Sequence, residues 1–174
     1  MFQAGEFVIY GNSGVCEVKE VGIPGFSAGE NPRSYYTLSP LHSTETIYTP
    51  VDTKVLMRTV ISSADARHLL EHFPELQEED YSACNTKWLA NAYESSLQDY
   101  TCETLMKLIK SICMRNCEVI LSKRKLNETD LKYLKRAEDL LYNEFSVALG
   151  LTVDDVKQII EEALDELMAQ KANS

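Results

Sequence analysis

The sequence contains little of what marks a secreted or membrane protein. Its five cysteines are odd in number and scattered along the chain, so we expect reduced thiols in a cytoplasm and no disulfide framework. No apolar run approaches the ~20 residues needed to cross a bilayer. The opening MFQAGEFVIYGNSG has no basic start followed by an apolar core. We therefore expect neither a membrane segment nor a secretory signal.

The sequence also lacks the usual catalytic motifs. It contains no GxxxxGK[ST] loop, no GxGxxG loop and no nucleophile elbow. His68 and His72 are four residues apart in an expected helix, but a third ligand and the HExxH arrangement are missing, so zinc is not expected. Cys113 and Cys117 lack an accompanying CxxC pair and are interpreted as buried thiols. We expect a protein that is not an enzyme and holds no cofactor.

The first sixty residues have the pattern of short strands. Val15–Val21 alternates apolar and polar residues, the period of a strand with one solvated face. Turn signals recur between the apolar runs, for example at Gly11–Gly14, and they indicate a small, strongly bent antiparallel barrel. The domain could be a plain scaffold, or an exposed edge strand could pair with a strand of another protein. The expected strands are 7–10, 15–21, 34–41, 46–49 and 55–58.

After about Arg58 the pattern changes to helices. Ser62 or Ser63 caps the first expected helix, and Gly150 ends the fourth. The 174 residues therefore predict an α+β chain with a β domain at 1–60 and a compact all-α domain at 61–174. The expected helices are 63–73, 86–97, 101–116, 127–149 and 152 onward, and the stripe expected to be buried in the third consists of Leu105, Leu108, Ile109 and Ile112.

Positive charge is concentrated in one part of an acidic chain. The formal net charge is −10, yet residues 107–136 hold nine Lys or Arg against three Asp or Glu, a local charge of +6. Clustered cations on helices are typical of a protein that touches a polyanion. The alternative is an ordinary solvated helical face.

Two motifs stand out along the chain. The first is the opening Phe2…Gly5-Glu6-Phe7-Val8-Ile9-Tyr10…Gly14-Val15, followed by Tyr35-Tyr36-Thr37-Leu38. The second lies in the helical half and runs from Leu105…Ile109 and Arg115 to Leu126-Asn-Glu-Thr-Asp130 and Leu141…Glu144. Together they resemble the CarD/CdnL family of bacterial transcription regulators, whose N-terminal module also occurs in transcription-repair coupling factors.

The resemblance implies a cytoplasmic, monomeric adaptor with two parts. A Tudor-like β-barrel would pair an edge strand with the β subunit of RNA polymerase, and a helical domain would contact promoter DNA and stabilise the open complex. The strand that matches the polymerase-binding strand consists of Thr46, Ile47, Tyr48, Thr49 and Pro50.

The single tryptophan, Trp88, lies near the family's minor-groove wedge position, and the alternative is an aromatic that packs between helices. We expect Lys110, Arg115 and Lys132 to lie on one exposed face. A rival hypothesis is a protein-interaction module that binds polymerase or another partner without touching DNA. The residues expected to bind DNA weakly and without sequence specificity are Trp88, Lys107, Lys110, Arg115, Lys123, Arg124, Lys125, Lys132, Lys135 and Arg136.

Overall fold

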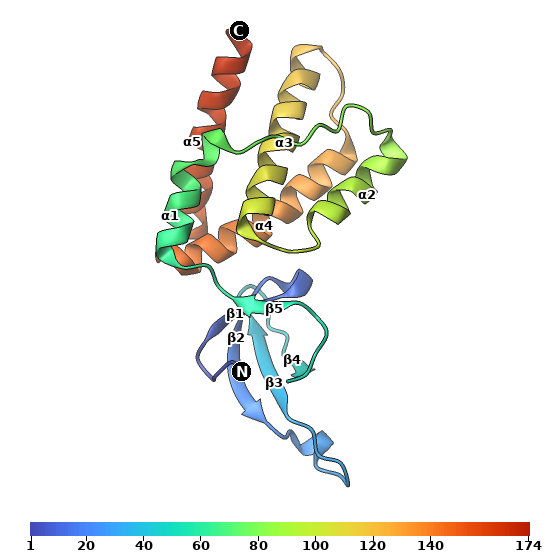
Figure 1. Cartoon of the computed structure of the whole chain (residues 1–174), viewed down its shortest axis with the longest axis vertical. Helices are drawn as coiled ribbons and strands as arrows, with labels where there is room; N and C mark the ends of the chain where they lie inside the picture. The colour runs from blue at the N-terminus through green and yellow to red at the C-terminus, as the bar shows by residue number, and fades with distance from the viewer. The chain divides into compact units, whose positions relative to one another are not determined.

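A computed structural model describes all 174 residues and divides into two compact units, Met1–Val60 and Ile61–Ser174 (Figure 1). The division falls where the sequence changes from strand to helix patterns. The first unit is a single antiparallel sheet and the second contains five α-helices, which confirms the predicted α+β fold. No helix is both long enough and apolar enough to span a bilayer.

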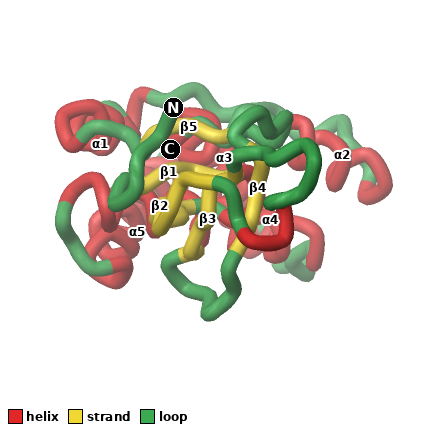
Figure 2. The backbone as a smooth tube through the Cα atoms, turned by 90° about the horizontal axis from the view of Figure 1, so that it is seen from below, coloured by secondary structure: helices red, strands yellow, loops and turns green.

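The N-terminal unit is a five-stranded sheet with the strand order β4-β3-β2-β1-β5 (Figure 2). Every pairing is antiparallel, and β4 and β5 each pair on one side only. The sheet thus has the strands expected of a small Tudor-like module, and it has two edges. The strands are β1 (Phe7–Tyr10), β2 (Val15–Gly22), β3 (Tyr35–Pro40), β4 (Ile47–Pro50) and β5 (Met57–Thr59).

Strand alternation accounts for the core of this unit. Residues of one parity on β1, β2 and β3 point to the same face, and they form one buried cluster. The turn between β1 and β2 uses Gly11 at φ +44° and Gly14 at φ +66°, a backbone region that side chains rarely adopt. A Cβ on Gly11 would also lie 3.1 Å from Cγ1 of Val55, so glycine is required there for two reasons. The buried cluster consists of Val8, Cys16, Val18, Tyr36 and Leu38.

Each α-helix of the helical unit is preceded by a residue whose side chain accepts a hydrogen bond from a backbone N–H of the first turn. Ser62, one of the two caps that the sequence predicted, caps the first helix, and Thr152 caps the last and forms a reciprocal capping box with Asp155. Gly150 ends the fourth helix in the left-handed conformation (φ +65°). The helices are α1 (Ser63–Glu71), α2 (Thr86–Ser96), α3 (Cys102–Leu121), α4 (Glu128–Leu149) and α5 (Val153–Ala172), and the short 3-10 turn η3 (Phe73–Glu75) follows α1.

Helix α3 is the centre of the helical core. The predicted stripe of Leu105, Leu108, Ile109 and Ile112 is buried, with each residue at most 1% exposed. The helix continues to Leu121, whereas the sequence predicted an end at residue 116. The extra residues include Val119, Ile120 and Leu121, which form one more turn before the chain reverses into α4. Apolar residues of α2, α4 and α5 complete the same cluster.

Candidate functional site

Strand β4 lies at one edge of the sheet. Its pairing with β3 determines which of its main-chain groups remain unpaired. It pairs with β3 in the register Thr37↔Tyr48 and Tyr36↔Thr49. The N–H of Val51 donates to the carbonyl of Ser34 at 3.1 Å, in the same register. Because hydrogen-bonded pairs alternate along an antiparallel ladder, Thr49 bonds to β3 and the main-chain groups of Tyr48 point away from it.

The two parities of β4 have different environments. Thr49 is 2% exposed, and its hydroxyl accepts a hydrogen bond of 3.0 Å from the hydroxyl of Tyr10. Ile47 packs against the buried cluster of the sheet. Tyr48 is on the opposite face and is 50% exposed. The inner residues therefore fix the strand in its register, and the ring and the outward main-chain groups of Tyr48 are free on the other side.

Two further aromatic rings surround Tyr48. The ring of Phe26 meets those of Tyr35 and Tyr48 edge-on, with centroid separations of 5.4 and 5.3 Å. Phe26 is 65% exposed even though it makes both contacts. We name Phe26, Tyr35 and Tyr48 the aromatic cluster. A shallow groove runs beside it, lined by Glu20, Gly22, Ile23, Pro24, Gly25, Thr37 and Tyr48.

Lys110 does not lie on the surface, and its predicted exposure is wrong. The residue is 4% exposed, and its ammonium group donates to the carbonyls of Pro74 (2.8 Å) and Leu76 (2.6 Å). A buried lysine needs acceptors for its charge, and here the chain around η3 supplies them. Lys110 therefore ties that segment to α3 and is not available to a phosphate.

Arg115 is also held inside the helical unit. Its Nε donates to Asp130 at 3.2 Å and its Nη1 to the carbonyl of Tyr81 at 3.3 Å. Asp130 is 1% exposed and also accepts a 2.7 Å hydrogen bond from the hydroxyl of Tyr93. Burial, together with this bond, raises the pKa of Tyr93 well above its usual range. The prediction that Lys110, Arg115 and Lys132 share one exposed face is therefore wrong, because Arg115 neutralises a buried carboxylate.

Three more of the predicted cations are paired with carboxylates of the chain. Lys107 Nζ lies 2.7 Å from Glu103, and Lys135 Nζ lies 3.7 Å from Asp139. Arg136 binds Glu94 through Nη1 at 2.8 Å. The hydrogen bond from Arg136 holds the pKa of Glu94 below its ordinary value, assisted by a bond from the hydroxyl of Tyr133. Internal contacts thus occupy five of the nine cations predicted to bind DNA.

The remaining candidates lie toward one end of the helical unit. Lys123, Arg124 and Lys125 are exposed in the loop between α3 and α4, and none of them forms an ion pair within the chain. Lys132 is exposed on α4, with its Nζ 5.8 Å from the ring centroid of Tyr133. Trp88 is 61% exposed in the first turn of α2. The interpretation of Trp88 as a packing aromatic is therefore wrong for this structure.

The contacts between α2 and α4 locate Trp88 relative to that loop. Tyr93 bonds to Asp130, and Glu94, the next residue on α2, bonds to Tyr133 and Arg136. The two helices therefore run in the same direction, and their N-terminal ends lie at the same end of the helical unit (Figure 1). We name the exposed candidates at this end the basic tip: Trp88, Lys123, Arg124, Lys125 and Lys132.

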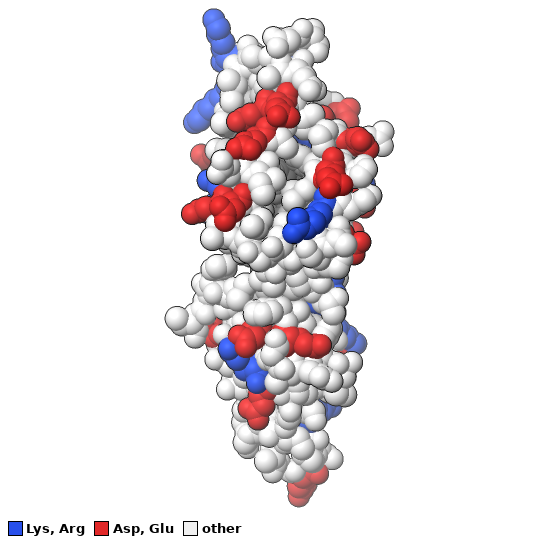
Figure 3. Space-filling model, turned by 90° about the vertical axis from the view of Figure 1, so that its left-hand side faces the viewer, with Lys and Arg blue, Asp and Glu red and all other residues white.

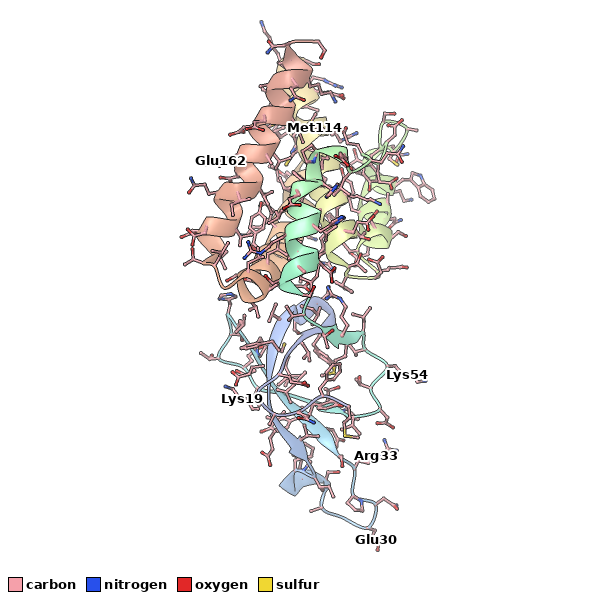
Figure 4. All side chains as sticks on the ribbon, turned by 60° about the vertical axis from the view of Figure 1, so that its left-hand side comes forward. Lys19, Glu30, Arg33, Lys54, Met114 and Glu162 are labelled. Atoms are coloured by element: carbon pink, nitrogen blue, oxygen red, sulfur yellow. The ribbon has the colours of Figure 1, made fainter.

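Acidic side chains lie on another face of the helical unit. Figure 3 shows several carboxylate clusters over the side formed by α1 and α5, with Lys and Arg side chains among them. Helix α5 alone contributes exposed Asp154, Asp155, Glu161 and Glu162, and Glu162 points outward from the helix in Figure 4. Helix α5 thus carries many exposed carboxylates, whereas the cations of the basic tip form no ion pair within the chain.

The sequence pattern does not single out Phe26, whose ring completes the aromatic cluster. It lies in the short 3-10 turn Gly25–Ser27 within a loop rich in glycine and proline, where no periodicity marks it. The only available signal was a large apolar residue in an otherwise polar loop. Its contacts with Tyr35 and Tyr48 depend on the pairing of β3 with β4, which sequence patterns do not place in space.

Comparison with known protein families identifies the first of the two units. A family model described as the CarD-like/TRCF RID domain matches residues 2–61. A search of curated proteins finds no match. The matched range contains all five strands, including the β4 edge, and ends where the helical unit begins. The five-stranded unit is therefore a CarD-like/TRCF RID domain, and this match supports a transcription-related protein that interacts with RNA polymerase.

Proposed function

We propose that this protein is a non-catalytic transcription regulator that binds the β subunit of RNA polymerase by strand addition to β4. The observation that carries the proposal is the free side of β4 within the matched domain. Tyr48 has its N–H and carbonyl directed away from β3. Thr46 comes directly before the strand, and Pro50, which has no N–H, ends it. An incoming strand would therefore be centred on Tyr48.

Strand addition suits this edge for physical reasons. Main-chain hydrogen bonds supply affinity without requiring a particular sequence, and the side chains on the two faces supply selectivity. The inner face of β4 is already filled by Ile47 and Thr49. Selectivity must therefore come from the outer face, where Tyr48 lies.

We propose further that the helical unit of this protein, acting as a monomer, contacts promoter DNA through the basic tip and stabilises the open complex. Trp88 is a large apolar side chain that is 61% exposed, and the same unit has exposed cations without an ion pair, the two features needed for an apolar wedge with phosphate contacts. The surface is much smaller than the sequence suggested, because five cations are engaged internally. Since the whole chain is acidic at −10, contact with DNA would depend on polymerase holding the protein close to the promoter.

The second candidate function is a protein-interaction module that binds polymerase and never contacts DNA. The observation in its favour is the internal pairing of Lys107, Arg115, Lys135 and Arg136 together with the burial of Lys110. The two candidates differ only in what the basic tip does. They can therefore be separated without disturbing the edge strand.

The test is the lifetime of the promoter open complex with the charge-reversed variant Lys123→Glu/Arg124→Glu/Lys125→Glu. We expect the variant to lose the increase in lifetime and to retain its affinity for polymerase. The loss of three phosphate contacts would also make the slope of log K against log [salt] less steep, by up to about 3. Lys19→Glu, in the N-terminal unit, is the charge-reversal control. Wild-type lifetimes with the triple variant would favour the module without DNA contact.

A further inference from the structure

The aromatic cluster and the loop beside it expose large apolar side chains to solvent. Phe26 is 65% exposed and Tyr48 50%, and Ile23 in the same loop is 52% exposed. Neither Phe26 nor Tyr48 belongs to the buried cluster of the sheet or to the residues packed on it. The fold of the N-terminal unit therefore does not depend on these two rings, and their exposure calls for a partner.

The geometry of strand addition specifies which partner residue would meet the cluster. Directly opposed residues of neighbouring strands have their side chains on the same face. A residue paired with Tyr48 therefore lies on the outer face. Phe26 closes the other side of Tyr48 at a centroid distance of 5.3 Å. The incoming side chain would contact the ring of Tyr48 first and the exposed part of Phe26 next.

We infer that the aromatic cluster of Phe26, Tyr35 and Tyr48 docks an aliphatic or aromatic side chain of the added polymerase strand, at the position opposite Tyr48. This inference rests on the proposed function, since it requires the strand. The surface of the cluster is aromatic, with Glu20 the one charged residue lining the adjoining groove, so an acidic side chain at that position is disfavoured. Phe26 thus selects among strands that the main chain of β4 alone would accept.

The experiment measures the affinity of the full-length protein for the cognate RNA polymerase core enzyme. We expect Phe26→Ala to weaken binding about tenfold, as for an aromatic anchor at the centre of an interface. Phe26→Leu retains an apolar contact and should lose less. Val55→Ala is the control, because Val55 is also an exposed apolar loop residue, at 45%. The melting temperature of Phe26→Ala should stay near wild type.

Photo-crosslinking identifies the partner residue directly. Benzoylphenylalanine at position 26 should crosslink to the polymerase β subunit at or beside an apolar residue of an extended segment. Unchanged affinity of Phe26→Ala, or a crosslink to a charged surface away from any strand, would overturn the inference. If Tyr48→Pro abolishes binding while Phe26→Ala does not, strand addition stands and only the docking role of the cluster fails. If neither variant loses affinity, both proposals fail.

Discussion

Replacing Lys110 by methionine should destabilise the helical unit without altering contact with DNA. The substitution retains the length of the side chain and removes two hydrogen bonds, to the carbonyls of Pro74 and Leu76. Hydrogen bonds to charged groups contribute about 1.5–3 kcal/mol each. Pro74 is exposed, so water can replace one donor, and Leu76 is half-buried. We therefore expect a loss of about 2–3 kcal/mol in the free energy of unfolding.

For a unit of this size, that loss corresponds to a melting temperature lower by roughly 8–12 °C. The matched control is Lys107→Met, one turn earlier on α3. Lys107 is partly exposed and forms a single i,i+4 pair with Glu103, so we expect a loss of only about 0.3–0.5 kcal/mol. Urea and thermal unfolding followed by circular dichroism measure both variants.

The contrast between the two variants decides between two roles for Lys110. At a temperature where both are folded, Lys110→Met should support open complexes of wild-type lifetime. Equal stability losses for Lys110→Met and Lys107→Met would refute the assignment of Lys110 as a structural residue. A shortened open complex with unchanged stability would restore Lys110 to the DNA-binding surface.

Two further predictions follow from side chains whose pKa the fold shifts. The pKa of Glu94 is held below its ordinary 4.5, chiefly by the hydrogen bond from Arg136, so its contribution is present at neutral pH and is lost as pH falls below 4.5. Glu94→Gln should cost no more than about 1 kcal/mol at pH 7, because the pair is half exposed. The cost should decline as the pH is lowered below 4.5, and a cost in urea unfolding that does not decline would count against the pair. Burial raises the pKa of Cys113 to about 12 and that of Cys16 to about 11, so both should resist alkylation at pH 8 until urea unfolds the chain, as mass spectrometry of the labelled peptides would show. Rapid labelling of either thiol in the native protein would contradict this.

Local signals in the sequence predicted much of the fold. Ser62, Asn127 and Thr152 are each followed by helical periodicity, and each caps a helix in the structure. The strand pattern of the first sixty residues predicted the bounds of the five strands to within a few residues. The prediction ended α3 too early: no helix-stopping residue follows Asn116 directly, and the helix continues to Leu121 although Ile120 and Leu121 are 60% and 61% exposed.

Only the part of the candidate site that is a strand could be predicted from the sequence pattern. Thr46–Pro50 was identified as a strand, and β4 is an edge strand. The role of each cation was not predictable, because it depends on partners distant in the sequence. Lys110 reaches carbonyls more than thirty residues away, and Arg136 reaches Glu94 across two helices. A local excess of positive charge therefore does not show how much of that charge is free.

The most direct test of the central claim compares proline substitutions on the two edges of the sheet. Tyr48→Pro removes an N–H that points away from β3, so it disrupts an added strand and leaves the β3–β4 ladder intact. Tyr48→Ala shows how much of the effect belongs to the side chain. Thr59→Pro is the matched control, since Thr59 lies on the opposite edge strand and, by the same alternation, also directs its N–H outward.

The measurement is the dissociation constant of each full-length variant for the cognate RNA polymerase core enzyme. We expect Tyr48→Pro to bind about tenfold more weakly than Tyr48→Ala, and Thr59→Pro to bind like wild type. Equal affinities for Tyr48→Pro and Tyr48→Ala, or a larger loss with Thr59→Pro, would contradict strand addition at β4.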